Sequence, residues 1–111
     1  MTAPTLRVGV SIPPSGFDNY GDAASYLAGI ADSGLDHVFT ADHVAFLGGH
    51  GRDALVTVAW LAGLHPTVDV YVGVYLLALR HPVVVARQIS TLAEQAPGRL
   101  TFGVGVGGED R

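Results

Sequence analysis

The sequence contains neither cysteine nor lysine, and no apolar run in it is long enough to cross a membrane. The lack of cysteine excludes disulfide bonds and thiolate metal sites. All six basic residues are arginine, and against ten acidic residues they leave a net charge of −4, which argues against binding to a nucleic-acid backbone. A membrane helix needs about 20 apolar residues, and the segment 1–4 does not resemble a signal peptide. We therefore expect a soluble, cytoplasmic protein without nucleic-acid or membrane partners.

Apolar runs and helical patterns alternate along the chain. Strands are predicted near residues 6–12, 36–43, 69–77 and 100–107, and helices near residues 22–33, 53–65 and 82–96. The strands recur about every 30 residues, which is the length of a βα unit. Alternation of this kind predicts an α/β fold with a parallel sheet and right-handed crossovers. A closed eight-stranded barrel needs about 200–250 residues, so the pattern alone allows a small open, flavodoxin-like domain or the front half of a barrel.

Asp42 and His43 follow the apolar run that starts at Val38. Ligands of α/β proteins bind beyond the carboxyl ends of parallel strands, and an imidazole can move a proton near neutral pH. The functional interpretation is a catalytic pair at the mouth of the sheet. The alternative is that Asp42 caps a following turn while His43 is merely exposed.

Glycines mark two other strands. The segment 103–108 formally contains G-x-G-x-x-G, which is a weak dinucleotide signal here but is compatible with a ligand-facing strand end. Gly73 interrupts a strong strand and indicates either a bulge or a packing accommodation. After that strand, Arg80 is expected either to meet an anionic ligand or to be solvated, and His81 to act as a helix cap rather than as a base.

Metal binding and hydrolase chemistry find little support. Five histidines are present, but they are scattered and form no H-x-H or H-E-x-x-H pattern, so no metal site is predicted. No G-x-S-x-G nucleophile elbow occurs either.

Taken together, these segments resemble the luciferase-like monooxygenase family, which is the bacterial luciferase superfamily and includes coenzyme F420-dependent enzymes. The resemblance rests on Asp42-His43, on Val72-Gly73-Val74, on Leu79-Arg80-His81-Pro82 and on the glycine-containing strand 100–108. It covers essentially the whole chain, but only the amino-terminal part of a family member. It implies that residues 1–111 form the N-terminal half of a TIM-type (β/α)8 barrel.

The resemblance also implies a flavin- or deazaflavin-dependent oxidoreductase acting on a small-molecule substrate. The expected cofactor is F420, with FMN as the alternative. His43 matches the family's catalytic histidine, which donates a proton or a hydrogen bond near the ring, and Asp42 would contact the ring system. Gly73–Val74 matches the family's non-prolyl cis peptide beneath the ring, and the backbone of Gly107 would line the cofactor pocket.

The sequence departs from the family pattern at a few positions. Ala78 stands where many members have proline, and Gly108 stands where some F420 enzymes carry a catalytic acid, so that role is not transferred to Glu109. Phosphate-binding loops from later strands are missing. We therefore expect a homo-oligomer or a missing C-terminal half, and the alternative function is a non-catalytic half-barrel that associates with a partner or with itself.

Overall fold

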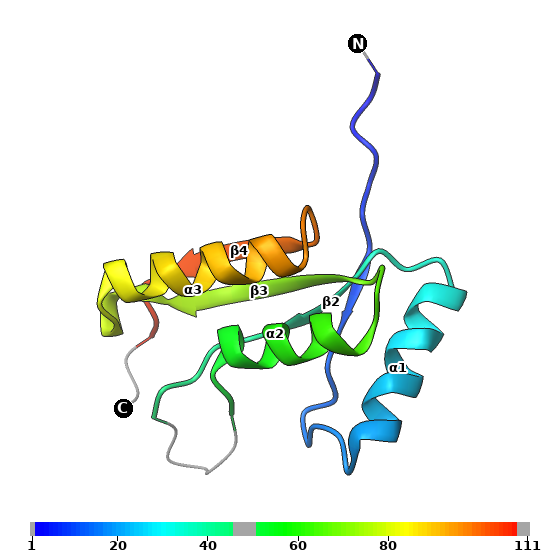
Figure 1. Cartoon of the computed structure of the whole chain (residues 1–111), viewed down its shortest axis with the longest axis horizontal. Helices are drawn as coiled ribbons and strands as arrows, with labels where there is room; N and C mark the ends of the chain where they lie inside the picture. Colours follow the sequence, from blue (N-terminus) through cyan, green and yellow to red (C-terminus); the bar gives the residue numbers. More distant parts are fainter. Residues whose placement is uncertain (1, 46–50, 109–111) are drawn as a thin grey trace.

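The computed structural model describes residues 2–45 and 51–108, and it alternates strands with helices throughout (Figure 1). In chain order the elements are β1 (Gly9–Ser11), α1 (Tyr20–Asp32), β2 (His37–Thr40), α2 (Ala54–Leu64), β3 (Asp69–Leu76), the 3-10 turn η1 (Leu77–Leu79), α3 (Pro82–Gln95) and β4 (Leu100–Gly105). Among these described helices, none is long and apolar enough to span a membrane.

The four strands form one parallel sheet in the order β1-β2-β3-β4. An open, doubly wound sheet would reverse its strand order and carry helices on both faces. Here the order follows the chain, and α2 and α3 cover the same face, with α1 beside them next to β1 and β2 (Figure 1). The predicted α/β half-barrel is therefore confirmed, and the flavodoxin-like alternative is wrong.

Local signals define the helix ends. Asn19 caps α1 by accepting a hydrogen bond from the backbone of Asp22 at 3.0 Å, so the helix begins two residues earlier than the apolar stripe indicated. Asp53 caps α2, and His81 caps α3 as predicted. Gly34, with φ 76°, adopts the left-handed conformation that ends α1.

The core lies between the sheet and its helices. Val38, Val70 and Val72 project from the covered face and are fully buried against a cluster that includes Val58 and Leu61 of α2. Burying each such side chain contributes about 1.5–3 kcal/mol relative to leaving it exposed. This packing explains the near-continuous apolar character of the strands.

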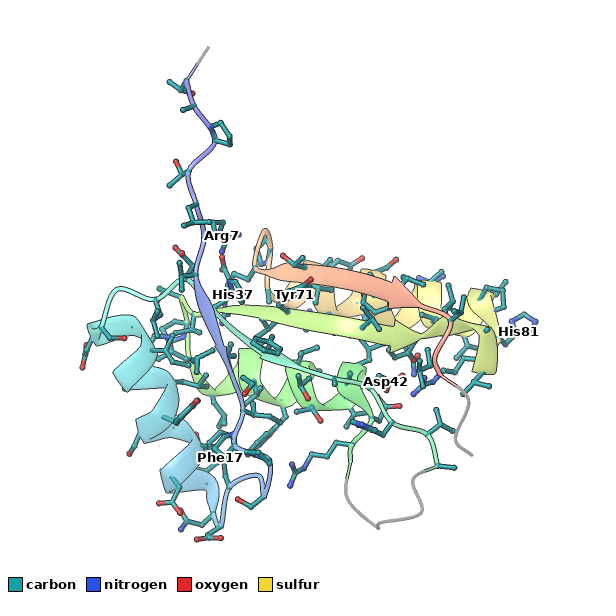
Figure 2. All side chains as sticks on the ribbon, turned by 180° about the vertical axis from the view of Figure 1, so that it is seen from behind. Arg7, Phe17, His37, Asp42, Tyr71 and His81 are labelled. Atoms are coloured by element: carbon teal, nitrogen blue, oxygen red, sulfur yellow. The ribbon has the colours of Figure 1, made fainter. Side chains whose placement is uncertain are left out.

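The opposite face of the sheet carries an aromatic row. His37 lies beside Tyr71 with 5.4 Å between ring centroids (Figure 2), and Phe39 lies 6.3 Å from the same tyrosine. All three side chains are only partly buried. In a closed barrel this face forms the packed interior, so it is the surface that further strands would cover.

All four strands are shorter than predicted, β3 by a single residue. β1 begins at Gly9 rather than at Leu6 because its pairing with β2 starts at the Gly9–His37 register. β2 ends at Thr40, so Asp42 and His43 follow the strand instead of belonging to it. β4 ends at Gly105 instead of Gly107.

Candidate functional site

Asp42 lies at the junction of three elements. Its Oδ1 accepts a hydrogen bond from the backbone of Ala54 at the start of α2, and its Oδ2 accepts one from the backbone of Leu76 at the end of β3, at 3.0 and 2.9 Å. The side chain is completely buried, with 0% of its surface exposed. Figure 2 shows it beyond the end of β2, at the other end of the sheet from Arg7.

Arg80 completes the environment of this carboxylate. Its two terminal nitrogens bind the two oxygens of Asp42, and one of them also binds Asp53 at 2.9 Å. The guanidinium lies 4.2 Å from the centre of the Tyr75 ring, a cation–π distance. Arg80 is therefore not merely solvated: it binds two carboxylates of the protein itself and packs on a buried ring, with 18% of its side chain exposed. Contact with an anionic ligand stays a prediction.

Asp42 and Arg80 shift each other's pKa in the directions that keep both side chains charged. Burial by itself raises the pKa of Asp42, but the Arg80 hydrogen bond, the two backbone amides and the Arg80 charge outweigh it, so the pKa lies below its usual value. The hydrogen bond to Asp42 raises the pKa of Arg80 despite burial. Both groups are therefore charged at neutral pH, and each charge is compensated inside the protein.

His43 faces a different space from Asp42. It is half-buried and lines a cavity of about 190 Å³ at the carboxyl ends of β1 and β2, whose walls include Ser11, Phe39 and Thr40. The backbone of His43 donates a hydrogen bond to the Arg52 carbonyl at 3.0 Å. Adjacent in sequence, Asp42 and His43 thus do not share one surface: the first anchors the strand end and the second faces the cavity.

The peptide between Gly73 and Val74 is cis, as the resemblance implied. The β3–β4 register shifts between Val72 and Tyr75, so the predicted bulge at Gly73 is confirmed. The neighbouring strand accommodates it with glycines. A Cβ on Gly103 would lie 2.7 Å from the Val72 carbonyl oxygen.

The glycine-containing end of β4 is therefore explained largely by its neighbour. A Cβ on Gly105 would lie 2.6 Å from a methyl group of Val74, and Gly107 has φ 82°, which favours glycine. The sequence pattern was compatible with a ligand-facing strand end, and the structure adds that these glycines pack against the bulge. The signal was present in Gly73, because a bulge in one strand constrains the strand beside it.

The structure groups the predicted site residues in two places. Gly73, Val74 and Gly107 belong to β3 and to β4 with its carboxyl extension, and among the described residues none of them lines the cavity of His43. Asp42 connects the two places because it binds the backbone of Leu76 at the end of β3. Glu109 lies outside the described residues.

Within the described part of the chain, no three histidine, aspartate or glutamate side chains are grouped so as to hold a metal ion. The chemical groups at this rim include the imidazole of His43, Arg52, which lines the same cavity, and the ordered backbone around them. These could hold one edge of an organic ring and exchange a proton with it. The cavity is smaller than the roughly 300–1,000 Å³ typical of sites that enclose a whole cofactor, so it fits only part of one.

Comparison with known proteins identifies relatives. A family model described as luciferase-like monooxygenase matches residues 3–111. F420-dependent glucose-6-phosphate dehydrogenase of Beutenbergia cavernae is 41% identical over 93 residues, which cover 78% of this chain and 27% of the relative. The same enzyme of Nakamurella multipartita is 32% identical over 111 residues, covering 96% of this chain and 32% of the relative.

Among solved structures, the fold matches the oxygenating constituent of 3,6-diketocamphane monooxygenase of Pseudomonas putida, solved with FMN. The TM-score is 0.75 at 17% identity, and the match covers 95% of this chain and 30% of the other. The chain thus spans about a third or less of the proteins it matches. With a half-barrel fold and a family match over nearly all its residues, the chain belongs to the luciferase-like monooxygenase family.

Proposed function

We propose that this chain supplies the amino-terminal half of an oxidoreductase that uses F420, with FMN as the second candidate, and acts on a small-molecule substrate. The observation that carries the proposal is the half-buried His43 in a cavity at the carboxyl rim of β1 and β2. Family barrels of the TIM type place their active sites at this rim. The rim of this chain also bears the cis peptide that the resemblance implied.

His43 is the proposed catalytic residue. The cofactor, when bound, supplies hydride transfer at its ring, and the protein positions the ring and manages the proton. An imidazole held in place by its backbone bond to Arg52 suits that task, because it can donate a hydrogen bond or a proton near neutral pH.

Gly73, Val74 and Gly107 are proposed to line the cofactor through their backbones, on the β3 and β4 side of the rim. Asp42 was expected to touch the ring as well, and that contact stays a prediction. The bonds of its buried carboxylate to Arg80, Ala54 and Leu76 support a positioning role, in which the anchored Asp42 fixes the backbone from which the next residue, His43, projects.

F420 is placed before FMN because of the relatives. Those at 41% and 32% identity are named as F420-dependent, whereas the structure with FMN is 17% identical and indicates the fold alone. Since the cavity of about 190 Å³ accommodates only one edge of either cofactor, further walls are needed, from β3 and β4 and from segments outside the described residues.

Cofactor titration of a full-length version of the protein tests the proposal. F420 should bind more tightly than FMN, as measured by fluorescence. His43→Ala should lower the affinity for the cofactor or change the orientation of its ring. The control His81→Asn, at a helix cap away from the cavity, should change neither. Absence of binding of either cofactor by the full-length protein would contradict the proposal.

The second candidate is a non-catalytic half-barrel that acts by association through its sheet. It is favoured by the partly buried aromatic row of His37, Phe39 and Tyr71, and by the exposed Thr101 of β4, which is the register partner of Tyr71 and lies on the same face. Thr101→Lys would place a charge on this face at β4 and should block such association. If Thr101→Lys leaves the oligomeric state unchanged, association through this face of the sheet is ruled out.

A further inference from the structure

Arg52 lines the same cavity as His43, and among the described residues it forms no ion pair. The two carboxylates of Asp42 and Asp53 bind Arg80 instead, and no described residue that lines the cavity carries a negative charge. We infer that Arg52 binds an anionic group of the substrate, a carboxylate or a phosphate, beside the imidazole of His43. This inference rests on the proposed function and adds the substrate class to it.

The backbone fixes Arg52 relative to His43. The amide of His43 donates a hydrogen bond to the Arg52 carbonyl at 3.0 Å, so the segment after β2 and the segment before α2 lie side by side. A Cβ on Gly51 would lie 2.6 Å from the Cγ of the His43 ring, so no side chain stands between the imidazole and the chain that leads to Arg52. The imidazole and the guanidinium therefore face one space.

The guanidinium of Arg52 lies against the loop between β1 and α1. One of its nitrogens donates a hydrogen bond to the carbonyl of Ser15 at 3.2 Å, and its other N–H groups have no partner among the described residues. Gly16 has φ 79°, and a Cβ there would lie 1.9 Å from the same nitrogen, so glycine leaves the space that the cation occupies. A guanidinium has more donors than this single bond uses. The remaining donors suit the oxygens of a carboxylate or a phosphate, which a guanidinium binds in pairs.

A second cavity lies on the other side of Arg52. It has a volume of about 150 Å³, and its lining residues include Phe17 and Trp60. Arg52 and Ile12 line both cavities, so the guanidinium stands where the two meet. A substrate can therefore present its reacting part to His43 while Arg52 binds its anionic group.

The charges of both cavities favour anions over cations. Apart from Arg52, their described lining residues supply the imidazole of His43, hydroxyl groups such as those of Ser11 and Thr40, and apolar side chains. An ammonium group would find no carboxylate there, whereas a carboxylate or a phosphate would gain a charge-assisted hydrogen bond. The substrate class that fits is therefore a small organic acid or a phosphate ester.

Fluorescence of Trp60 provides the test, because Trp60 is the only tryptophan of the chain and lines the second cavity together with Arg52. The full chain is titrated with inorganic phosphate and, separately, with acetate, at an ionic strength held constant with sodium chloride. At least one of the two anions should change the emission to saturation, and which one does so distinguishes a phosphate site from a carboxylate site.

Variants of Arg52 assign this response. Arg52→Met should raise the dissociation constant of the anion by about tenfold or more, because a charged hydrogen-bond donor is lost. Arg52→Lys keeps the charge and should raise it less. The matched control Arg87→Met, at an exposed arginine of α3, should leave it unchanged, and circular dichroism of all three variants should match that of the parent. A parent without a saturable response, or an equal response in Arg52→Met, would overturn the inference.

A cofactor titration separates the substrate from the cofactor as the source of the anion. In a full-length version, Arg52→Met should leave the affinity for F420 unchanged. A fall in F420 affinity as large as the fall in anion affinity would overturn the assignment to the substrate. Failure of the full-length parent to bind F420 would instead contradict the proposed function alone, since the anion titration does not involve the cofactor.

Discussion

Arg80 binds both oxygens of Asp42 although 38 positions separate the two residues. The pair joins the loop after β2 to the segment between β3 and α3, and Asp53 adds the start of α2 to the same cluster. Two consecutive βα units, β2–α2 and β3–α3, are thus held together at the rim that carries His43. Since the Asp42 side chain is fully buried and that of Arg80 is 18% exposed, the contribution of this pair depends on both partners being present.

Arg80→Met should destabilise the protein by about 3 kcal/mol, because it leaves the buried Asp42 carboxylate without its counter-ion. Urea unfolding at neutral pH measures this loss. Arg7→Met is the matched control, because Arg7 pairs with Asp69 while 48% of its side chain is exposed. That change should cost about 1 kcal/mol or less, and equal losses for the two variants would contradict the difference in burial.

Asp42→Asn should likewise lower the free energy of unfolding, because it changes the other member of the ion pair. Alone it removes a charge that Arg80 needs, and combined with Arg80→Met it should cost much less than the sum of the single losses. A double-mutant cycle from the same unfolding curves gives the coupling. Simple additivity would show that the two side chains do not stabilise each other.

Lowering the pH should reduce the free energy of unfolding of the parent more than that of Asp42→Asn. The folded-state pKa of Asp42 is lowered, so its stabilising effect is complete above its unfolded pKa of about 4 and is lost as the pH falls through the folded value. The difference in unfolding free energy between parent and variant should therefore shrink below about pH 4. A difference that stays constant down to the acid-unfolding limit would argue against this assignment.

Gly103→Ala should destabilise by about 1–3 kcal/mol, since its Cβ would meet a backbone oxygen that cannot move aside. Gly105→Ala should cost less, because its Cβ would meet a Val74 side chain that is 43% exposed and can rotate. Gly29 of α1 is the control, as nothing lies within 4 Å of its added Cβ. Gly29→Ala should stabilise by about 0.5–1 kcal/mol. Thermal unfolding ranks the three variants, and any other order would contradict the packing argument.

His43→Ala in a full-length version should lower the turnover number by about 10²–10⁴-fold, the usual contribution of a positioned acid or base. Steady-state kinetics with the loaded enzyme measures the effect. His65→Ala serves as a comparison, because His65 accepts backbone hydrogen bonds from Thr67 and Val68 at the opposite rim. Any effect of His65→Ala should be a loss of folding stability, with the turnover number of the folded enzyme unchanged.

Features that depend on neighbouring residues were predictable from the sequence. Asp53 and Pro82 mark helix starts and Gly34 marks a helix end, because capping and backbone conformation involve residues only a few positions apart. The spacing of the apolar runs likewise predicted a parallel α/β sheet, whereas the half-barrel was implied by the resemblance to a family. Gly73–Val74 was identified through resemblance to a family, and the bulge there was confirmed.

Contacts between distant residues were decided by the tertiary structure alone. Nothing near Arg80 in the chain indicates that its partner is Asp42, because that contact depends on β2 and β3 being neighbours and on where β2 ends. The requirement for glycine in β4 also depends on a distant segment, because an added Cβ would meet the bulge in the adjacent strand. Periodicity and capping depend on residues close together in the chain. Ion pairs and steric limits across a sheet depend on residues far apart in the chain, which only the strand order and register bring into contact.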